Sequence, residues 1–189
     1  MVKKQRRKIN PMDTSATTVA LKLVMLMAAI NNAEGRDVAI MDIPEAFISA
    51  SFLKDEIVNI VFQLRMAEFI VNTDPRICGQ YIFKGTNRSL MLYVQLKKVL
   101  YILLRSAFLF YEKLVGDLKA NGFKLNPYDC CVINKIVNGK QLTIFWHVDD
   151  LKVFYVDMNV VTNTITWIES VYREMHGSRG KKHDYLGMW

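Results

Sequence analysis

The feature that most constrains how this chain can fold is a pair of adjacent acidic residues, Asp149 and Asp150, between two apolar segments. The flanking residues 145–148 and 151–154 are mostly β-branched and aromatic, which predicts a β-hairpin with the acids at or beside its tip. Two carboxylates this close repel each other unless a cation lies between them. Carboxylate oxygens of this kind suit Mg²⁺. Two interpretations therefore remain open, a solvated turn or a metal site.

A third carboxylate, Asp42, ends the short apolar run 38–41 and is followed by Ile43 and Pro44. The residue before a proline avoids the helical region and proline is favoured at a helix start, so a strand should end near Asp42. Asp42 could serve only as a helix cap, which is common for aspartate at such a junction. Alternatively, the strand carries it to the same sheet edge as the hairpin acids. Three carboxylates on one edge could hold two metal ions, as in phosphoryl transfer.

A series of short blocks follows along the chain in a recognisable order. They are Asp-Ile-Pro-Glu-Ala-Phe at 42–47, Leu-Lys-Lys-Val-Leu-Tyr at 96–101, Phe-Tyr-Glu-Lys-Leu at 110–114, Asn-Gly-Phe at 121–123 with Asp129, His-Val-Asp-Asp at 147–150 and Tyr-Leu-Gly at 185–187. In order and spacing they resemble the reverse transcriptase domain of Ty1/copia-type LTR retrotransposons, from about Thr14 to the C-terminus. The corresponding family blocks are Asp-Val-Lys-x-Ala-Phe, Leu-Lys-Lys-Ala-Leu-Tyr, Trp-Tyr-x-Lys-Leu, Gly-Phe…Asp, Tyr-Val-Asp-Asp and Phe-Leu-Gly.

This resemblance implies an RNA-directed DNA polymerase and a role for each matched position. Asp42, Asp149 and Asp150 would be the catalytic carboxylates of a polymerase palm and would bind two Mg²⁺ or Mn²⁺ ions. Phe47 would lie under the incoming sugar and select deoxynucleotides, a role compatible with its being a core aromatic. The residues implied to bind the nucleotide are Phe47, Tyr101, Arg105, Ser106 and His147. Those implied at the primer and template are Lys181, Lys182, Tyr185, Leu186 and Gly187.

Some positions depart from the family pattern. His147 replaces the usual tyrosine, and Ile102 stands where the family has a glycine that can adopt positive φ. The resemblance also leads us to expect a truncated copy that lacks the fingers, thumb and RNase H segments of the polyprotein. A catalytically inactive remnant, acting at most as a basic nucleic-acid-binding module, is the alternative function. Another palm-type two-metal enzyme is disfavoured by the 96–101 block and Phe47.

Charge and length agree with a nucleic-acid partner. The chain has 189 residues, enough for one domain with a sizeable core, and 25 Lys and Arg against 18 Asp and Glu give a net charge of +7. Basic proteins bind phosphate backbones irrespective of sequence. Part of the excess lies in a basic tail, residues 1–13, which precedes the partial reverse transcriptase domain at 14–189. The expected partners are an RNA or DNA template-primer and deoxynucleoside triphosphates.

Cysteine usage and hydropathy bear on the compartment. Cys78, Cys130 and Cys131 form neither a secreted disulfide framework nor a Cys-x-x-Cys zinc spacing, so we expect a reducing compartment, cytoplasmic or nuclear. The apolar stretch 16–30 is too short to span a membrane and is interrupted by Lys22. We therefore expect a buried helix there and no membrane association.

These patterns together predict an α+β fold, a polymerase-palm-like antiparallel sheet backed by two long helices. Helices are expected at 15–31, 44–51, 106–121 and 159–175, and strands at 38–42, 57–64, 81–84, 90–94, 131–136, 142–147 and 151–156.

Overall fold

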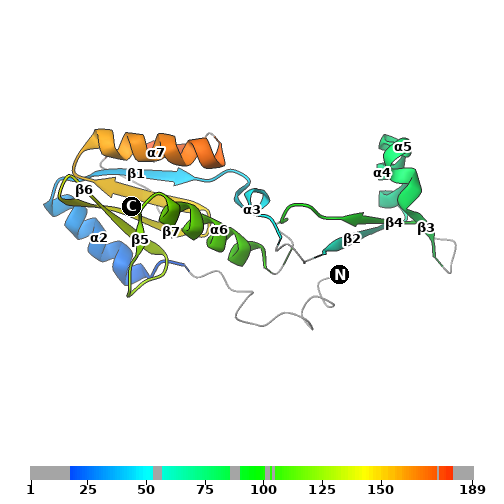
Figure 1. The fold of residues 1–189 in the computed structure, drawn as a ribbon, viewed down its shortest axis with the longest axis horizontal. Coiled ribbons are helices and arrows are strands. Elements are labelled where there is room, and N and C mark those ends of the chain that lie inside the picture. The colour runs from blue at the N-terminus through cyan, green and yellow to red at the C-terminus, as the bar shows by residue number, and fades with distance from the viewer. Residues whose placement is uncertain are drawn as a thin grey trace.

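The main unit is a six-stranded sheet with helices on both sides, which confirms the predicted α+β class (Figure 1). The computed structural model describes residues 18–52, 57–85, 90–100, 103, 105–173 and 175–180. The strand order in the sheet is β5-β6-β7-β8-β1-β9, and every neighbouring pair is antiparallel. Its strands are β1 (Asp37–Asp42), β5 (Lys124–Leu125), β6 (Val132–Val137), β7 (Lys140–His147), β8 (Asp150–Tyr155) and β9 (His176–Arg179).

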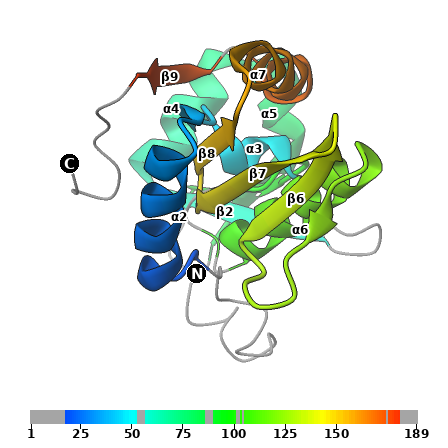
Figure 2. The same cartoon turned by 90° about the vertical axis from the view of Figure 1, so that its left-hand side faces the viewer.

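The central strands of this sheet are covered on both faces. Residues 38–41 of β1, 142–146 of β7 and 151–155 of β8 are all buried. A sheet with one solvated face would alternate between buried and exposed residues, so continuous burial requires cover on each side. Helices α6 (Ser106–Ala120) and α7 (Met158–Tyr172) meet on one side, where Phe110 and Tyr172 pack edge to face at 6.1 Å. Helix α2 (Leu21–Ala33) lies on the other side (Figure 2).

Two tight hairpins order the middle of the sheet. Asn138 and Gly139 join β6 to β7 with φ angles of 48° and 75°, the pattern of the type I′ turn that an Asn-Gly pair predicts. Val148 and Asp149 join β7 to β8 and put the acidic pair at the hairpin tip, as expected. Both hairpins are therefore confirmed.

The helices differ from expectation in detail. Residues 18–20 are not helical, so α2 begins at Leu21, and the predicted start at 15 lies outside the described residues. The prediction of a buried helix is wrong for one face of α2, where Leu21, Met25 and Leu26 are each more than half exposed. Helix α6 agrees with its predicted range. Its buried apolar face is Leu109, Phe110, Leu114, Val115 and Leu118, and Phe108 and Tyr111 are partly buried against the same core.

A smaller three-stranded sheet of order β2-β4-β3 lies at the opposite end of the molecule from α2 (Figure 1). The expected hairpin of β3 and β4 is present, and β2 pairs with β4. The helical residues between β2 and β3 were not predicted. The elements of this part, with the short helix that leads to it, are α3 (Ala46–Ser49), β2 (Asn59–Gln63), α4 (Arg65–Thr73), α5 (Pro75–Cys78), the 3-10 helix η2 (Gly79–Tyr81), β3 (Ile82–Lys84) and β4 (Leu90–Gln95).

Strand β9 closes the edge of the main sheet beside β1 and was also not predicted. The Arg179 guanidinium forms an ion pair with Asp37 at 2.5 Å, which fixes this strand to β1. Gly177 faces the Ile40 carbonyl so closely that a Cβ there would lie 2.5 Å from the oxygen. The pairing of β9 with β1 therefore depends on a residue without a side chain.

In the part of the chain that the structure describes, no helix has both the length and the hydropathy needed to cross a membrane.

Candidate metal and nucleotide site

The three predicted carboxylates meet at one edge of the main sheet. Asp42 is the last residue of β1 and Asp150 the first of β8, and the antiparallel register places them directly opposite each other. Directly opposite residues project from the same face with Cβ atoms about 4.5–5.5 Å apart. The Ile43 amide donates to the Asp149 carbonyl at 3.1 Å, which ties the hairpin tip to the end of β1. Two segments more than a hundred residues apart in sequence therefore bring their acids together.

This edge is electrostatically unfavourable for negative charge. Burial raises the pKa of Asp149, and the negative charge of Asp42 raises it further, against a lowering by backbone hydrogen bonding and by His147. Burial likewise raises the pKa of Asp150, with the charges of Asp149 and Asp42 acting in the same direction and His147 opposing them. Folding thus places the Asp149 and Asp150 carboxylates where their ionisation is disfavoured. A bound cation would favour the ionised carboxylates and so lower their pKa again.

The turn that presents the acids is itself strained. Val148 has a φ of 60°, whereas the φ of Asp149 is not positive. A positive φ at only the first of the two central residues is the pattern of a type II′ turn. Glycine is favoured at that first position, and a β-branched residue there costs on the order of 1–3 kcal/mol. Strain of this kind concentrates at functional sites, where the surrounding structure holds the backbone in place.

Two further ionisable side chains flank the acids. His147 ends β7, lies in register with Asp150 and is half-buried, so its imidazole borders the carboxylates. Lys152 follows Asp150 by two residues on β8 and so projects from the same face. Burial lowers the pKa of Lys152, whose side chain is only 9 % exposed. Lys152 was not among the predicted site residues, although a lone cation within an apolar strand was a signal for it.

Phe47 lies in α3, shortly after Asp42, and belongs to the core. It is 7 % exposed and packs edge to face against Phe110 at 6.0 Å between ring centroids. This geometry agrees with the core interpretation. Its role as a sugar gate stays a prediction.

Arg105 and Ser106 lie together at the start of α6. The Ser106 hydroxyl donates to the Leu103 carbonyl at 2.8 Å and also contacts the Leu100 carbonyl, so it holds the turn that leads into the helix. The Arg105 guanidinium lies over the Phe108 ring at 5.9 Å. Nucleotide contacts by these two residues stay predictions.

The remaining site residues lie outside the described part of the chain. They are Tyr101, Lys181, Lys182, Tyr185, Leu186 and Gly187.

The donor chemistry of the edge fits Mg²⁺ or Mn²⁺, because all three predicted ligands offer carboxylate oxygens. Among the described residues, a different group brings three metal-ligand side chains close together. Its members are Asp129, Cys130 and Cys131, whose donor atoms all lie within 4.8 Å of one another. The three edge aspartates do not meet that spacing. They would therefore rotate toward one another to share ions.

Comparison with known proteins found no family and one similar structure. No protein-family model matches the chain, and no curated protein matches it. One solved structure is similar, the telomerase of Candida albicans in complex with a TWJ fragment of telomeric RNA, with a TM-score of 0.40 and 13 % identity. The similarity covers 89 % of this chain and 31 % of that one, so this chain spans about a third of the telomerase chain's length. This similarity is too low to assign a function, which must come from the residues of the site.

Proposed function

We propose that this chain is the palm core of a Ty1/copia-type reverse transcriptase, an RNA-directed DNA polymerase that uses Asp42, Asp149 and Asp150. The observation that carries the proposal is the strand register that sets Asp42 opposite Asp150, with Asp149 in the intervening turn. A sheet edge that gathers three carboxylates and raises the pKa of Asp149 and Asp150 is suited to divalent cations.

In this proposal the chain's own residues position the reacting groups. A pair of bound Mg²⁺ or Mn²⁺ ions would supply activation of the primer 3′-hydroxyl and charge neutralisation on the leaving pyrophosphate. Asp42 and Asp150 would hold the ions from adjacent strands, whose register sets these two residues opposite each other. Asp149 would complete the ligand set from the strained turn, whose tether to Ile43 limits its movement.

Phe47 is proposed to lie under the sugar of the incoming nucleotide and so to select deoxynucleotides. Its edge-to-face contact with Phe110 supports this, because a ring wedged against a helix cannot move aside for a ribose 2′-hydroxyl. Arg105 and Ser106 at the start of α6, with Tyr101 and His147, are proposed to border the nucleotide.

The net charge of +7 supports a nucleic-acid partner, since neutralised phosphates supply most of the affinity that is independent of sequence. An RNA or DNA template-primer would then be recognised through its backbone and shape, and base pairing would read the sequence. Lys181, Lys182 and residues 185–187 are proposed to contact the primer. Fingers, thumb and RNase H segments of a polyprotein are proposed as the parts that complete the enzyme.

A second candidate function is a catalytically inactive nucleic-acid-binding module. It is favoured by His147, which stands beside the acids where the resemblance has tyrosine, and by the same basic charge. The two candidates differ in whether metal-dependent synthesis accompanies binding.

Template-primed extension by the purified chain with Mg²⁺ or Mn²⁺ tests the proposal. Asp149→Asn is the site variant and Asp157→Asn, at an exposed helix cap, is the matched control. We expect synthesis by the parent and by the control, and template binding without synthesis by the site variant. Salt-dependent binding without synthesis by any of the three would favour the inactive module. Equal extension by parent and site variant would refute the carboxylate assignment.

A further inference from the structure

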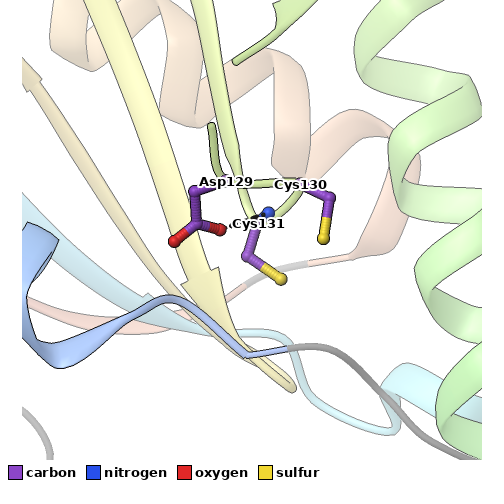
Figure 3. A group of neighbouring side chains, drawn as sticks. All are labelled: Asp129, Cys130 and Cys131. Carbon is purple, nitrogen blue, oxygen red and sulfur yellow. Dashed lines mark hydrogen bonds between the residues drawn. The ribbon is translucent and has the colours of Figure 1, made fainter. Parts of the chain in front are cut away.

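A separate cluster of metal-ligand side chains lies at the start of β6. The carboxylate of Asp129 and the thiols of Cys130 and Cys131 have donor atoms that all lie within 4.8 Å of one another. Figure 3 shows the carboxylate and the two sulfur atoms directed to the same side of the chain. None of Cys78, Cys130 and Cys131 is joined in a disulfide.

The local backbone explains how adjacent cysteines come to face the same space. Neighbours within a strand point to opposite faces, so the two thiols would be separated if both cysteines lay in a strand. The structure instead begins β6 at Val132, whose amide donates to the Asp129 carbonyl at 3.2 Å and closes a turn over both cysteines. The predicted strand start is therefore wrong by one residue. Cys130 and Cys131 both lie in the turn that precedes the strand.

Asp129 is held in place by hydrogen bonds that leave it able to bind a metal. Its Oδ1 accepts from the Cys131 amide at 2.8 Å, and its Oδ2 accepts from the Ala20 amide at 2.9 Å. Each carboxylate oxygen has a further lone pair. Such bonds to a ligand carboxylate orient it toward an ion. Because Ala20 precedes α2, the positive end of that helix also offsets negative charge at the cluster.

Tyr111 adds a fourth polar group from α6. Its hydroxyl donates to the Cys130 carbonyl at 3.2 Å. The cluster thus combines a buried thiol at Cys131 with an exposed thiol at Cys130, and an ion can reach it from the exposed side.

We propose that Asp129, Cys130 and Cys131 bind a thiophilic divalent cation of the Zn²⁺ class, with water or the Tyr111 hydroxyl as the fourth ligand. Two sulfur ligands and one carboxylate are a donor set that zinc accepts, and ligands of a tetrahedral zinc ion lie about 3.5–3.8 Å apart. Small side-chain rotations bring donors at the observed spacing to that distance. Binding displaces one proton from each thiol to solvent and involves no redox change.

This site is chemically distinct from the carboxylate edge and does not depend on the polymerase proposal. Soft thiolates select zinc-class ions, whereas the all-oxygen edge selects Mg²⁺ or Mn²⁺. An ion at the start of β6 would brace this end of the sheet, since the Cys131 carbonyl accepts from the Trp146 amide one residue before His147.

Titration of the reduced, purified chain with Cd²⁺ tests the proposal through the ultraviolet charge-transfer band of cadmium-bound thiolates. We expect one ion per chain and a band that Zn²⁺ displaces. Cys130→Ser, at the exposed position, should weaken Cd²⁺ binding at least about tenfold and reduce the band. Cys78→Ser is the matched control, because Cys78 lies in α5 of the smaller sheet region, and it should leave both unchanged.

Two results would overturn the proposal. One is the absence of a thiolate band in the folded parent, with folding checked by circular dichroism. The other is full Cd²⁺ affinity in Cys130→Ser. Because Cys131 is fully buried and its replacement could disturb folding, the exposed Cys130 carries the test.

Discussion

Replacing Asp150 by asparagine should stabilise the metal-free protein. The exchange keeps the shape of the side chain and removes a negative charge that lies directly opposite Asp42 across two strands. Favourable cross-strand pairs contribute about 0.2–1 kcal/mol and like charges at directly opposite positions destabilise, so we take a cost of the same order, to which relief of burial adds. We therefore expect Asp150→Asn to raise the free energy of unfolding by about 1 kcal/mol at neutral pH. For a chain of this length that is a rise of about 2–4 °C in Tm.

The pH dependence of this gain identifies its cause. The pKa of Asp150 is raised in the folded state, so the protonated form favours folding, and the parent loses stability as the pH rises through that raised pKa. Below the ordinary value of 3.8 both proteins carry a neutral group, and their stabilities should converge. With Mg²⁺ at about 100 times its Kd the order should reverse, because binding to the parent alone adds about 2.7 kcal/mol.

Chemical denaturation from acidic to neutral pH, with and without Mg²⁺, measures these differences. Asp157→Asn is the control, because asparagine caps a helix as well as aspartate does and Asp157 lies outside the paired strands. A loss of stability in metal-free Asp150→Asn at neutral pH, or a gain that does not change with pH, would refute the electrostatic reasoning.

Further substitutions test the packing around the site. Phe47→Ala should lower the free energy of unfolding by about 3–5 kcal/mol, and Phe47→Leu by about 1.5 kcal/mol or less. If chemical denaturation shows the same loss of stability for both variants, Phe47 does not belong to the core. Tyr172→Phe should lower the free energy of unfolding by about 1.5 kcal/mol, because the Tyr172 hydroxyl donates to Asp117 at 2.6 Å. An unchanged denaturation midpoint would show that this hydrogen bond does not stabilise the fold. Gly177→Ala should loosen β9, since its new Cβ would meet the Ile40 carbonyl, and limited proteolysis should then cut at 176–180. Parent-like protease resistance would contradict this.

Local chemistry made much of the main sheet predictable. The Asn138-Gly139 pair has the residues that a type I′ turn requires, and it set the β6–β7 register. Ile43-Pro44 marked the end of β1, so Asp42 could be placed at a strand terminus. The meeting of Asp42 with the hairpin acids followed from the resemblance and was not fixed by either segment alone.

Other elements depended on contacts that no local pattern reveals. β9 reads His-Gly-Ser-Arg, with no apolar alternation, and is held by β1 and the Arg179–Asp37 ion pair. Helix α4 begins after Leu64, which adopts a φ of 54° that leucine rarely takes. In contrast, α5 had a readable start, because Asp74 precedes Pro75 and caps the helix by accepting from the Ile77 amide.

Mn²⁺ binding in the assembled complex tests the central claim most directly, that Asp42, Asp149 and Asp150 exist to hold catalytic cations. The free-ion electron paramagnetic resonance signal of Mn²⁺ would be followed with the chain, a template and chain-terminated primer, and the next deoxynucleotide. We predict that the parent and Cys130→Ser remove Mn²⁺ from solution and that Asp149→Asn, Asp150→Asn does so at least about tenfold more weakly. Equal Mn²⁺ uptake by the parent and the double variant would contradict the claim.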